Sequence, residues 1–361
     1  STVSGPLRWL VGGNYKQSTN RSASSGSGIA GYRLDPGKPV IVFQGGGGYG
    51  RATSKSFAVF TDGSYSPFER FEIGGGIRYF KETRDGVGFN LLGDQISDNT
   101  GTFKKLTFRI FVKYAINNQL NLYGNTATGF RSGGFNGDFA VLNGAPPTYD
   151  PETSQFYEVG AKTSFLNGAL KFDVALYSGS YKYQGQSTFA FNSDNTTYGY
   201  LLNAGTAKIK GVEWLLQLSP ISGLDLAFSG NDPKTKYTKT TRTAPVQVGD
   251  PLDFVPKYEL MANADYKFAL SDSAEGFISV SSTWKGRQQN SNRDSGVGDP
   301  VNIGPKHHFL QASVGAEFSG YRFTIFGKNL VDERGILSPQ FSGLRPQARP
   351  RSIGFSIEKS F

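Results

Sequence analysis

Few residues in this 361-residue chain could carry chemistry: it contains two histidines and no cysteine. The histidines, His307 and His308, are adjacent at the expected start of a strand. Neighbouring residues of a strand point to opposite faces, so the two imidazoles are poorly placed to share one ligand. No Ser–His–acid arrangement for nucleophilic catalysis can be located. We therefore expect no enzymatic activity, no metal site and no cofactor.

A second group of polar residues alternates with apolar ones and would share one face of a sheet. Such a row suits either a hydrated wall of mixed charge, which is the simpler interpretation, or a selective path for a solute. The candidates for lining a lumen are Arg78, Arg109, Lys113, Glu158, Lys162, Lys171 and Asp173, together with Arg8, Lys16 and Glu72.

The element that would position these residues is a long β-strand. One example is the run in which Leu106, Phe108, Ile110, Val112 and Tyr114 alternate with Thr107, Arg109, Phe111 and Lys113. Such runs reach about 10–14 residues, whereas a strand in a globular protein averages about 5–6. A tilted strand that crosses the hydrocarbon of a membrane needs about 9–11 residues. The length of the runs therefore favours membrane-spanning strands over a soluble sandwich.

The connections between these runs alternate between short and long. Short ones are expected at 66–68, 117–118, 166–168, 219–223 and 319–320, and long ones near 17–54, 83–102, 131–152, 184–204, 233–253, 288–306 and 332–348. Short periplasmic turns and long extracellular loops are typical of outer-membrane barrels. The stretch from Ser22 to Gly50 is the most compositionally biased segment, and we expect a loop there.

The predicted fold is all-β, an antiparallel transmembrane β-barrel with about 14 strands in a single domain over residues 1–361. The strands are expected at 7–16, 55–65, 69–82, 103–116, 119–130, 153–166, 168–183, 205–218, 223–232, 255–268, 275–287, 307–318, 321–331 and 350–361. An open sheet edge is costly in lipid, so the strands must close on themselves or on strands outside this chain. Aromatic girdles at the two interfaces are expected from Trp9, Tyr15, Tyr65, Tyr79, Tyr114 and Phe361.

The composition and charge of the chain exclude a helical membrane protein and bear on its binding partners. The mean hydropathy is −0.37 and no apolar run exceeds about five residues, whereas a membrane-spanning helix needs about 20. The net charge of +9 is most simply that of a solvated surface, and the functional alternative is attraction to anions, either lipopolysaccharide phosphates or an anionic solute in a lumen. Nucleic acid is not expected as a partner, because the basic residues are dispersed along the chain.

Several motifs in the second half of the chain resemble the C-terminal half of TonB-dependent outer-membrane receptors. The matching segments are Leu122 to Gly124, Gly129 to Asn136, Pro151 to Lys162, Asn203 to Glu213, Gly327 to Asp332 and Pro350 to Phe361. The motifs occur in the family's order and spacing, and the rhythm of strands and loops extends the resemblance back to about Leu7. The resemblance implies location in the outer membrane of a Gram-negative bacterium, in contact with membrane lipid and lipopolysaccharide.

The last strand resembles the terminal strand that the outer-membrane barrel assembly machinery recognises. Ile353, Phe355, Ile357 and Phe361 are the candidate residues of this assembly signal, and Lys359 departs from the family's apolar or aromatic pattern. In receptors of this type the outer loops contact the ligand. By that resemblance the outer-loop ligand candidates are Arg131, Phe135, Asn136, Tyr149 and Asp150.

The chain departs from the family at its N-terminal side. The family resemblance implies a TonB-contacting box, a globular plug and a barrel of 22 strands, but this sequence shows neither box nor plug. Its strands resemble the last 14, so about eight are missing. We expect either one part of a receptor, with TonB and a plug or the missing strands supplied by another polypeptide, or a smaller plugless barrel.

Three functions remain open from the sequence. The first is energised uptake of a scarce solute of the siderophore, cobalamin or glycan class, as part of a TonB-dependent receptor. The second is passive diffusion through a plugless porin of about 14 strands. The third is a structural barrel within a surface assembly. The substrate itself cannot be derived from these residues.

Overall fold

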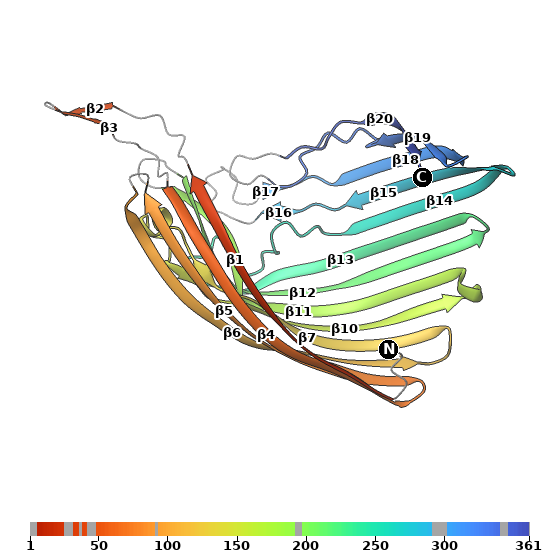
Figure 1. The fold of residues 1–361 in the computed structure, drawn as a ribbon, viewed down its shortest axis with the longest axis horizontal. Helices are drawn as coiled ribbons and strands as arrows, with labels where there is room; N and C mark the ends of the chain where they lie inside the picture. Colours follow the sequence, from red (N-terminus) through yellow and green to blue (C-terminus); the bar gives the residue numbers. More distant parts are fainter. Residues whose placement is uncertain are drawn as a thin grey trace.

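The computed structural model describes residues 6–24, 32–35, 38–41, 48–90, 93–191, 197–290, 302–339 and 346–360. Its main feature is one antiparallel sheet of 14 strands that neighbour one another in chain order (Figure 1). The strands are β1 (Leu7–Ser24), β4 (Gly48–Phe68), β5 (Phe71–Asn90), β6 (Gln95–Ala115), β7 (Leu120–Arg131), β10 (Glu152–Phe165), β11 (Leu170–Phe191), β12 (Thr197–Ile221), β13 (Leu224–Thr240), β14 (Glu259–Ser271), β15 (Ala274–Lys285), β18 (His307–Phe318), β19 (Tyr321–Lys328) and β20 (Ser352–Lys359).

The sheet is strongly curved and open (Figure 1). Within the described ranges, β1 and β20 are its two edges and are not hydrogen-bonded to each other. The predicted all-β class and antiparallel barrel architecture with 14 strands are confirmed. No helix in the described part of the chain is long and apolar enough to span a bilayer.

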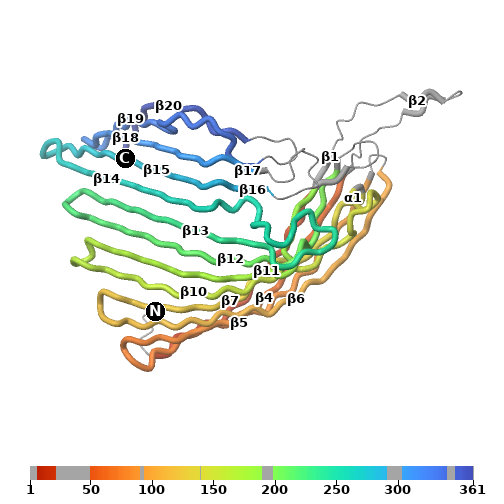
Figure 2. Tube along the Cα trace, turned by 180° about the vertical axis from the view of Figure 1, so that it is seen from behind, coloured from red at the N-terminus to blue at the C-terminus, as the bar shows by residue number. Residues whose placement is uncertain are grey.

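Smaller elements lie at one end of the sheet, opposite the short turns (Figure 1; the tube in Figure 2 shows α1 and the turns from behind). They are β2 (Tyr32–Asp35), β3 (Lys38–Ile41), β8 (Gly134–Phe135), α1 (Asp138–Leu142), β9 (Thr148–Tyr149), β16 (Gln289–Asn290) and β17 (Asn302–Ile303). The one-turn helix η1 (Leu166–Gly168) forms a short turn instead. Loops therefore gather at one end of the barrel wall, which is the extracellular end.

Most strands run further toward the extracellular end than predicted. The stretches 17–24, 48–54, 83–90 and 95–102 were predicted to be loop but extend β1, β4, β5 and β6. In the Ser22–Gly50 segment, β2 and β3 form a small hairpin, and the remaining positions include residues outside the described ranges. These stretches lack apolar alternation, yet a neighbouring strand supplies hydrogen-bonded partners along them, with a register shift between Gly88 and Phe89.

The short turns sit at the opposite, periplasmic end, where β1 begins and β20 ends (Figure 1). The turn expected at 66–68 lies instead at Glu69 and Arg70, between β4 and β5. The turn of Ser319 and Gly320 has φ values of 50° and 75°, as a tight hairpin between twisted strands requires.

The sheet has one inward and one outward face, and the inward face is the concave one. Neighbouring strands are about 4.8 Å apart, so side chains from strands two apart meet where the sheet curves toward them, most readily across a small middle side chain. Such contacts join Arg109 of β6 to Asp62 of β4, and Tyr177 of β11 to Asn231 of β13. On the middle strands, Gly76 is paired with both Asp62 and Arg109, and Gly211 is paired with Tyr177.

Aromatic rings cover several glycines of the inward face. A Cβ added to Gly160 would meet the ring of Tyr123 at 2.6 Å, and one added to Gly354 would meet the ring of Phe326 at 2.6 Å. The glycines thus leave room for rings from the next strand, which pack flat against the wall of the sheet. Aromatic residues that cover glycines also pin the register between strands.

The outward face is apolar and exposed. Ile110 is 49% exposed, Phe355 is 77% exposed and Trp9 is 73% exposed. Together these side chains form the surface that contacts lipid, because a transmembrane barrel turns its apolar positions outward. The outward positions of Tyr15, Tyr65, Tyr79 and Tyr114 are set by the same ladders.

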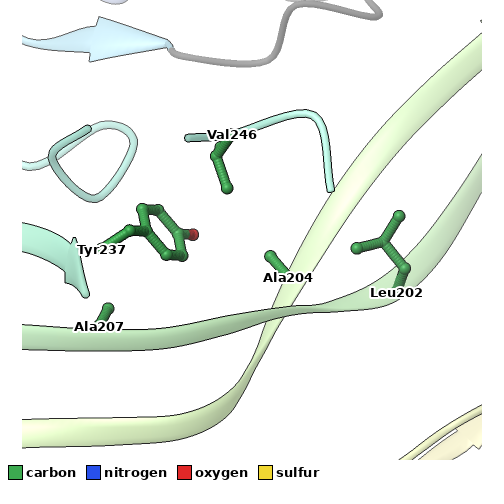
Figure 3. Packing of buried hydrophobic residues seen from close by; sticks show 5 residues of the cluster. All are labelled: Leu202, Ala204, Ala207, Tyr237 and Val246. Atoms are coloured by element: carbon green, nitrogen blue, oxygen red, sulfur yellow. The ribbon is translucent and has the colours of Figure 1, made fainter. Parts of the chain in front are cut away.

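A compact core lies where the loop after β13 packs against the extracellular parts of β12 and β13 (Figure 3). It contains Leu202, Ala204 and Ala207 of β12, Tyr237 of β13 and Val246 of the following loop. Tyr237 is fully buried, and its hydroxyl donates to Gln184 Oε1 at 2.5 Å and Gln186 Oε1 at 3.2 Å. This packing fixes the 241–258 loop against the extracellular ends of β12 and β13.

Candidate functional site

The candidate site is the inward face of the sheet. The ladders place every charged residue predicted to line a lumen on this one face, because directly paired residues share a face. These residues are Arg78, Arg109, Lys113, Glu158, Lys162, Lys171 and Asp173. Their alternation in sequence was sufficient to group them, while the contacts between them required the strand registers.

Ion pairs neutralise most of the charge on the periplasmic half of this face. Arg109 donates two hydrogen bonds of 2.7 Å to the carboxylate of Asp62. Glu72 accepts from Arg8 at 2.6 Å and from Lys113 at 3.2 Å. Lys162 lies 3.9 Å from Asp173 on the adjacent strand. This half therefore matches a hydrated wall of paired charges.

Glu158 and Lys171 occupy the same wall. Glu158 accepts a hydrogen bond of 3.2 Å from the amide of Asn125. Lys171 of β11 is exposed and lies opposite Ser164 of β10. Neither residue lines the hollow of about 850 Å³ on this face.

A cavity of about 850 Å³ opens on the extracellular half of the inward face. Its walls come from β1, β4, β5 and β7 and from the segment that follows β7. The cationic side chains lining it are Lys16, Arg78 and Arg84, and the aromatic ones are Phe80, Phe130, Phe135 and Tyr149. Ligand pockets commonly measure about 300–1,000 Å³, so this hollow can hold a solute of substantial size.

Of the residues predicted to line a lumen, Arg78 and Lys16 reach this cavity. The contacts of Arg78 are the better defined. Its guanidinium donates to Asn14 Oδ1 at 3.2 Å and lies 5.6 Å from the centre of the Phe60 ring. Both partners are uncharged, so no carboxylate among these contacts neutralises the cation.

Glu82 and Arg84 form an ion pair at the edge of the cavity, and neither residue was predicted from the sequence to belong to the site. Glu82 is 7% exposed, accepts from Ser54 at 2.5 Å and lies 3.1 Å from Arg84. Arg84 also donates to the carbonyl of Gly133 at 2.9 Å. The pair thereby ties the segment after β7 to β5. Both residues continue the alternation of Glu72, Arg78 and Phe80, so extending the predicted strand beyond residue 82 would have identified Arg84.

The outer-loop ligand candidates separate into two groups. Phe135 and Tyr149 line the cavity. Asn136 is 8% exposed, and its amide donates to the carbonyls of Pro146 and Leu201 at 2.8 Å each. These bonds commit the Asn136 amide to holding the loop.

The other two candidates lie outside the cavity. Arg131 is exposed and lies 4.0 Å from Glu152. Asp150 is exposed, and its backbone amide donates to the side chain of Asn203 at 2.7 Å. As ligand contacts, all five residues stay predictions.

The two histidines point to opposite faces, as their adjacency implies. His308 stacks on Trp284 at 4.9 Å on the outward face and shares a 2.8 Å hydrogen bond with Ser282. His307 is buried on the inward side, 4.0 Å from Glu333. Across the described ranges, no cluster of three or more His, Cys, Asp or Glu side chains could hold a metal ion.

Ile353, Phe355 and Ile357 of the expected assembly signal share the outward face of β20 and are 73%, 77% and 58% exposed. Lys359 continues this outward row, with its ammonium group 5.0 Å from the centre of the Tyr321 ring. Phe361 lies outside the described residues.

Comparisons with known proteins agree with this architecture. A family model described as "TonB dependent receptor-like, beta-barrel" matches residues 1–331. The pesticin receptors of Yersinia pestis and Yersinia enterocolitica are 24% and 25% identical over 264 residues, which is 69% of this chain and 34% of each relative. The chain therefore spans about one third of the length of these curated relatives.

Solved structures show the same fold over almost the whole chain. The ferric yersiniabactin uptake receptor FyuA from Yersinia pestis aligns with a TM-score of 0.70 and 17% identity, covering 99% of this chain and 56% of that one. The siderophore receptor PiuA from Acinetobacter baumannii aligns with a TM-score of 0.71 and 17% identity, covering 98% and 53%. The chain thus corresponds to about half of each solved receptor chain.

Proposed function

The chain belongs to the family of TonB-dependent receptor-like β-barrels of the Gram-negative outer membrane, and from this membership we propose that it forms part of the wall of a receptor that imports an iron–siderophore complex. The two solved relatives described above are a ferric yersiniabactin uptake receptor and a siderophore receptor. The observation that carries the proposal is the inward cavity of about 850 Å³ at the extracellular end.

The lining of the cavity holds three cations, Lys16, Arg78 and Arg84, against two carboxylates, Glu82 and Asp85, and this excess of positive charge supports a large, anionic and partly flat solute. Arg78 supplies a cation whose contacts are uncharged, and Lys16 adds a second. Phe80, Phe135 and Tyr149 supply apolar and ring surface beside them. A few polar groups within an aromatic lining are typical of sites that orient a small molecule.

The open edges of the sheet support a larger assembly. β1 and β20 each have one ladder partner within the described residues. In lipid, each unpaired backbone group costs several kcal/mol, so we propose that strands outside this chain segment complete the barrel and that a plug fills it. TonB and the barrel assembly machinery are the further partners implied by this proposal.

The test is binding and uptake by the protein as the cell makes it, in a strain that produces no siderophore of its own. Ferric siderophores of the catecholate, hydroxamate and carboxylate classes are offered separately as 55Fe complexes. We expect one class to bind and to support growth under iron limitation only when TonB is present. Uptake that continues without TonB would support the passive porin instead.

The variant R78Q tests the cavity. Loss of one charge-assisted contact should weaken binding about tenfold. The matched control is K171Q, which removes an inward, exposed cation far from the cavity. Equal affinities of R78Q, K171Q and the unmodified protein would exclude this cavity as the binding site.

A further inference from the structure

His307 occupies the point where two extracellular segments meet. It is the first residue of β18, and Gly304 and Pro305 lead the chain into it. Gly335, in the segment that follows β19, lies beside the imidazole, since a Cβ at this position would be 3.4 Å from His307 Cε1. Gly304 lies against Pro339 of the same segment, where a Cβ would be 3.2 Å from the proline ring. The imidazole is therefore enclosed between the chain that enters β18 and the chain that leaves β19.

The Nδ1 atom of this imidazole is buried without a hydrogen bond. The His307 side chain is 3% exposed. Across the described ranges, its Nδ1 is the one buried side-chain nitrogen or oxygen that has no hydrogen-bond partner. Glu333 Oε1 lies 4.0 Å away, which is too far for a hydrogen bond. Buried polar atoms are almost always satisfied, so an exception at this position indicates a role.

The carboxylate of Glu333 is held in front of this nitrogen by other contacts. Its Oε1 atom accepts a hydrogen bond of 2.8 Å from the backbone amide of Gly335. The side chain of Asn329 accepts from the backbone amide of Glu333 and donates to its carbonyl, at 2.9 Å each. The same side chain donates to the carbonyl of Arg349 at 2.7 Å, so it joins the two ends of the loop. The carboxylate is thus positioned without any help from His307.

The other charged groups around the ring are paired or exposed. Lys285 is directly opposite the ring on β15 and lies 3.7 Å from Glu259 of β14. Asp332 and Arg334 flank the buried carboxylate in sequence and pair with each other at 2.9 Å. Lys306 precedes the ring and is exposed. One carboxylate therefore remains to interact with Nδ1.

We propose that His307 and Glu333 form an acid-closed latch between the two extracellular segments. In a neutral imidazole that carries its proton on Nε2, a lone pair of Nδ1 faces the carboxylate, and two acceptors do not attract each other. Protonation places a hydrogen on Nδ1, which then donates a charge-assisted hydrogen bond to Glu333 Oε1 after a movement of about 1 Å. Histidine is the side chain that takes up a proton within the range of about pH 8 to pH 5. Acidification of the medium therefore fastens the segment after β19 to the start of β18, whatever solute the protein imports.

The test exploits a sequence that has two histidines and no cysteine. Ser338→Cys places the sole thiol in the segment after β19, and a spin label attached to it reports the mobility of this segment. Electron paramagnetic resonance compares about pH 8 with about pH 5, in protein purified from outer membranes and without any solute. The latch variants are H307Q and E333Q. H308Q is the matched control, because it removes the neighbouring imidazole on the outward face.

We expect the mobile fraction of the label to fall about tenfold on acidification in the S338C background and in H308Q, as the gain of one charge-assisted hydrogen bond implies. H307Q and E333Q should keep the same mobility at both pH values. Heat-modified migration on gels checks that each variant is folded. A label that does not respond in the S338C background, a response that persists in H307Q or E333Q, or a response lost in H308Q would overturn the proposal.

Nitrogen NMR of protein labelled with 15N-histidine gives a second, direct readout. The His307 signals are assigned by their absence in H307Q, and the two ring nitrogens are distinguished by their chemical shifts. Nδ1 of His307 should be unprotonated at the alkaline end of the range and protonated at the acidic end. An Nδ1 that stays in one state across the range would contradict the latch.

Discussion

Arg109 and Asp62 form a two-pronged ion pair across Gly76, with both hydrogen bonds at 2.7 Å. The two residues belong to β6 and β4, and β5 runs between them. A Cβ at position 76 would collide with Asp62 Oδ2 and lie 3.0 Å from the carbonyl oxygen of Thr61. The contact between Arg109 and Asp62 therefore requires a glycine at position 76.

The substitution Gly76→Val should destabilise the folded protein more than Asp62→Asn. Overpacking against backbone costs about 1–3 kcal/mol, whereas a solvated ion pair contributes about 1 kcal/mol or less. Arg109 is 57% exposed, so water screens the pair. Urea unfolding in detergent micelles measures both variants. An equal loss of stability in D62N and G76V would contradict this prediction.

Adjacent residues of β13 test which face meets lipid. Phe228 is outward and 38% exposed, whereas Ser229 is inward. Phe228→Arg should cost about 2–4 kcal/mol, because an arginine is then placed in hydrocarbon. Ser229→Arg should change stability much less, since its side chain enters the hydrated interior. Guanidinium titration in phospholipid vesicles compares the two, and equal losses would mean that the faces are assigned incorrectly.

The three tryptophans provide a second test of the lipid-facing surface. Trp9, Trp214 and Trp284 are the only tryptophans of the sequence, and the ladders place all three outward. Lipids with brominated acyl chains should therefore quench most of the intrinsic fluorescence, while aqueous iodide should quench little. W9F serves as the control, because it removes the emission of the ring that is 73% exposed. Strong quenching by iodide and weak quenching by bromolipid would contradict this arrangement.

Tyr237 should make the extracellular core sensitive to alkaline pH. Its burial, reinforced by the nearby charge of Asp253, raises the pKa of its phenol well above the ordinary value of 10. The unfolded chain releases this proton near pH 10 and the folded chain only at higher pH. The stability contributed by the neutral phenol is therefore complete below pH 10 and is lost as pH rises toward the folded pKa.

Absorbance at 295 nm and limited proteolysis of the 241–258 loop follow this transition. Tyr237→Phe is the matched control: it should abolish the tyrosinate that appears last and make loop opening independent of pH in this range. If the unmodified protein and Y237F open with the same pH dependence, the phenol is not the titrating group.

The sequence alone determined the class of the fold, the number of strands and the face on which each strand residue lies. Alternation along a strand is local: Leu106 and Arg109 belong to opposite faces whatever lies beside them. The same property separated His307 from His308. The ends of the strands could not be predicted as well from the sequence. Residues 83–90 and 95–102 lack apolar alternation and form strands only by pairing with each other.

Only the tertiary structure decided which residues meet across strands. The opposition of Lys208 and Lys236 depends on the tight turn between β12 and β13 and on the register shifts within their ladder. A slip of one residue would send one of the two lysines to the other face. The tie from Glu82 and Arg84 to Gly133 likewise joins segments that are distant in the chain. Such contacts depend on the relative register of several paired strands. The alternation within one strand carries no information about that register.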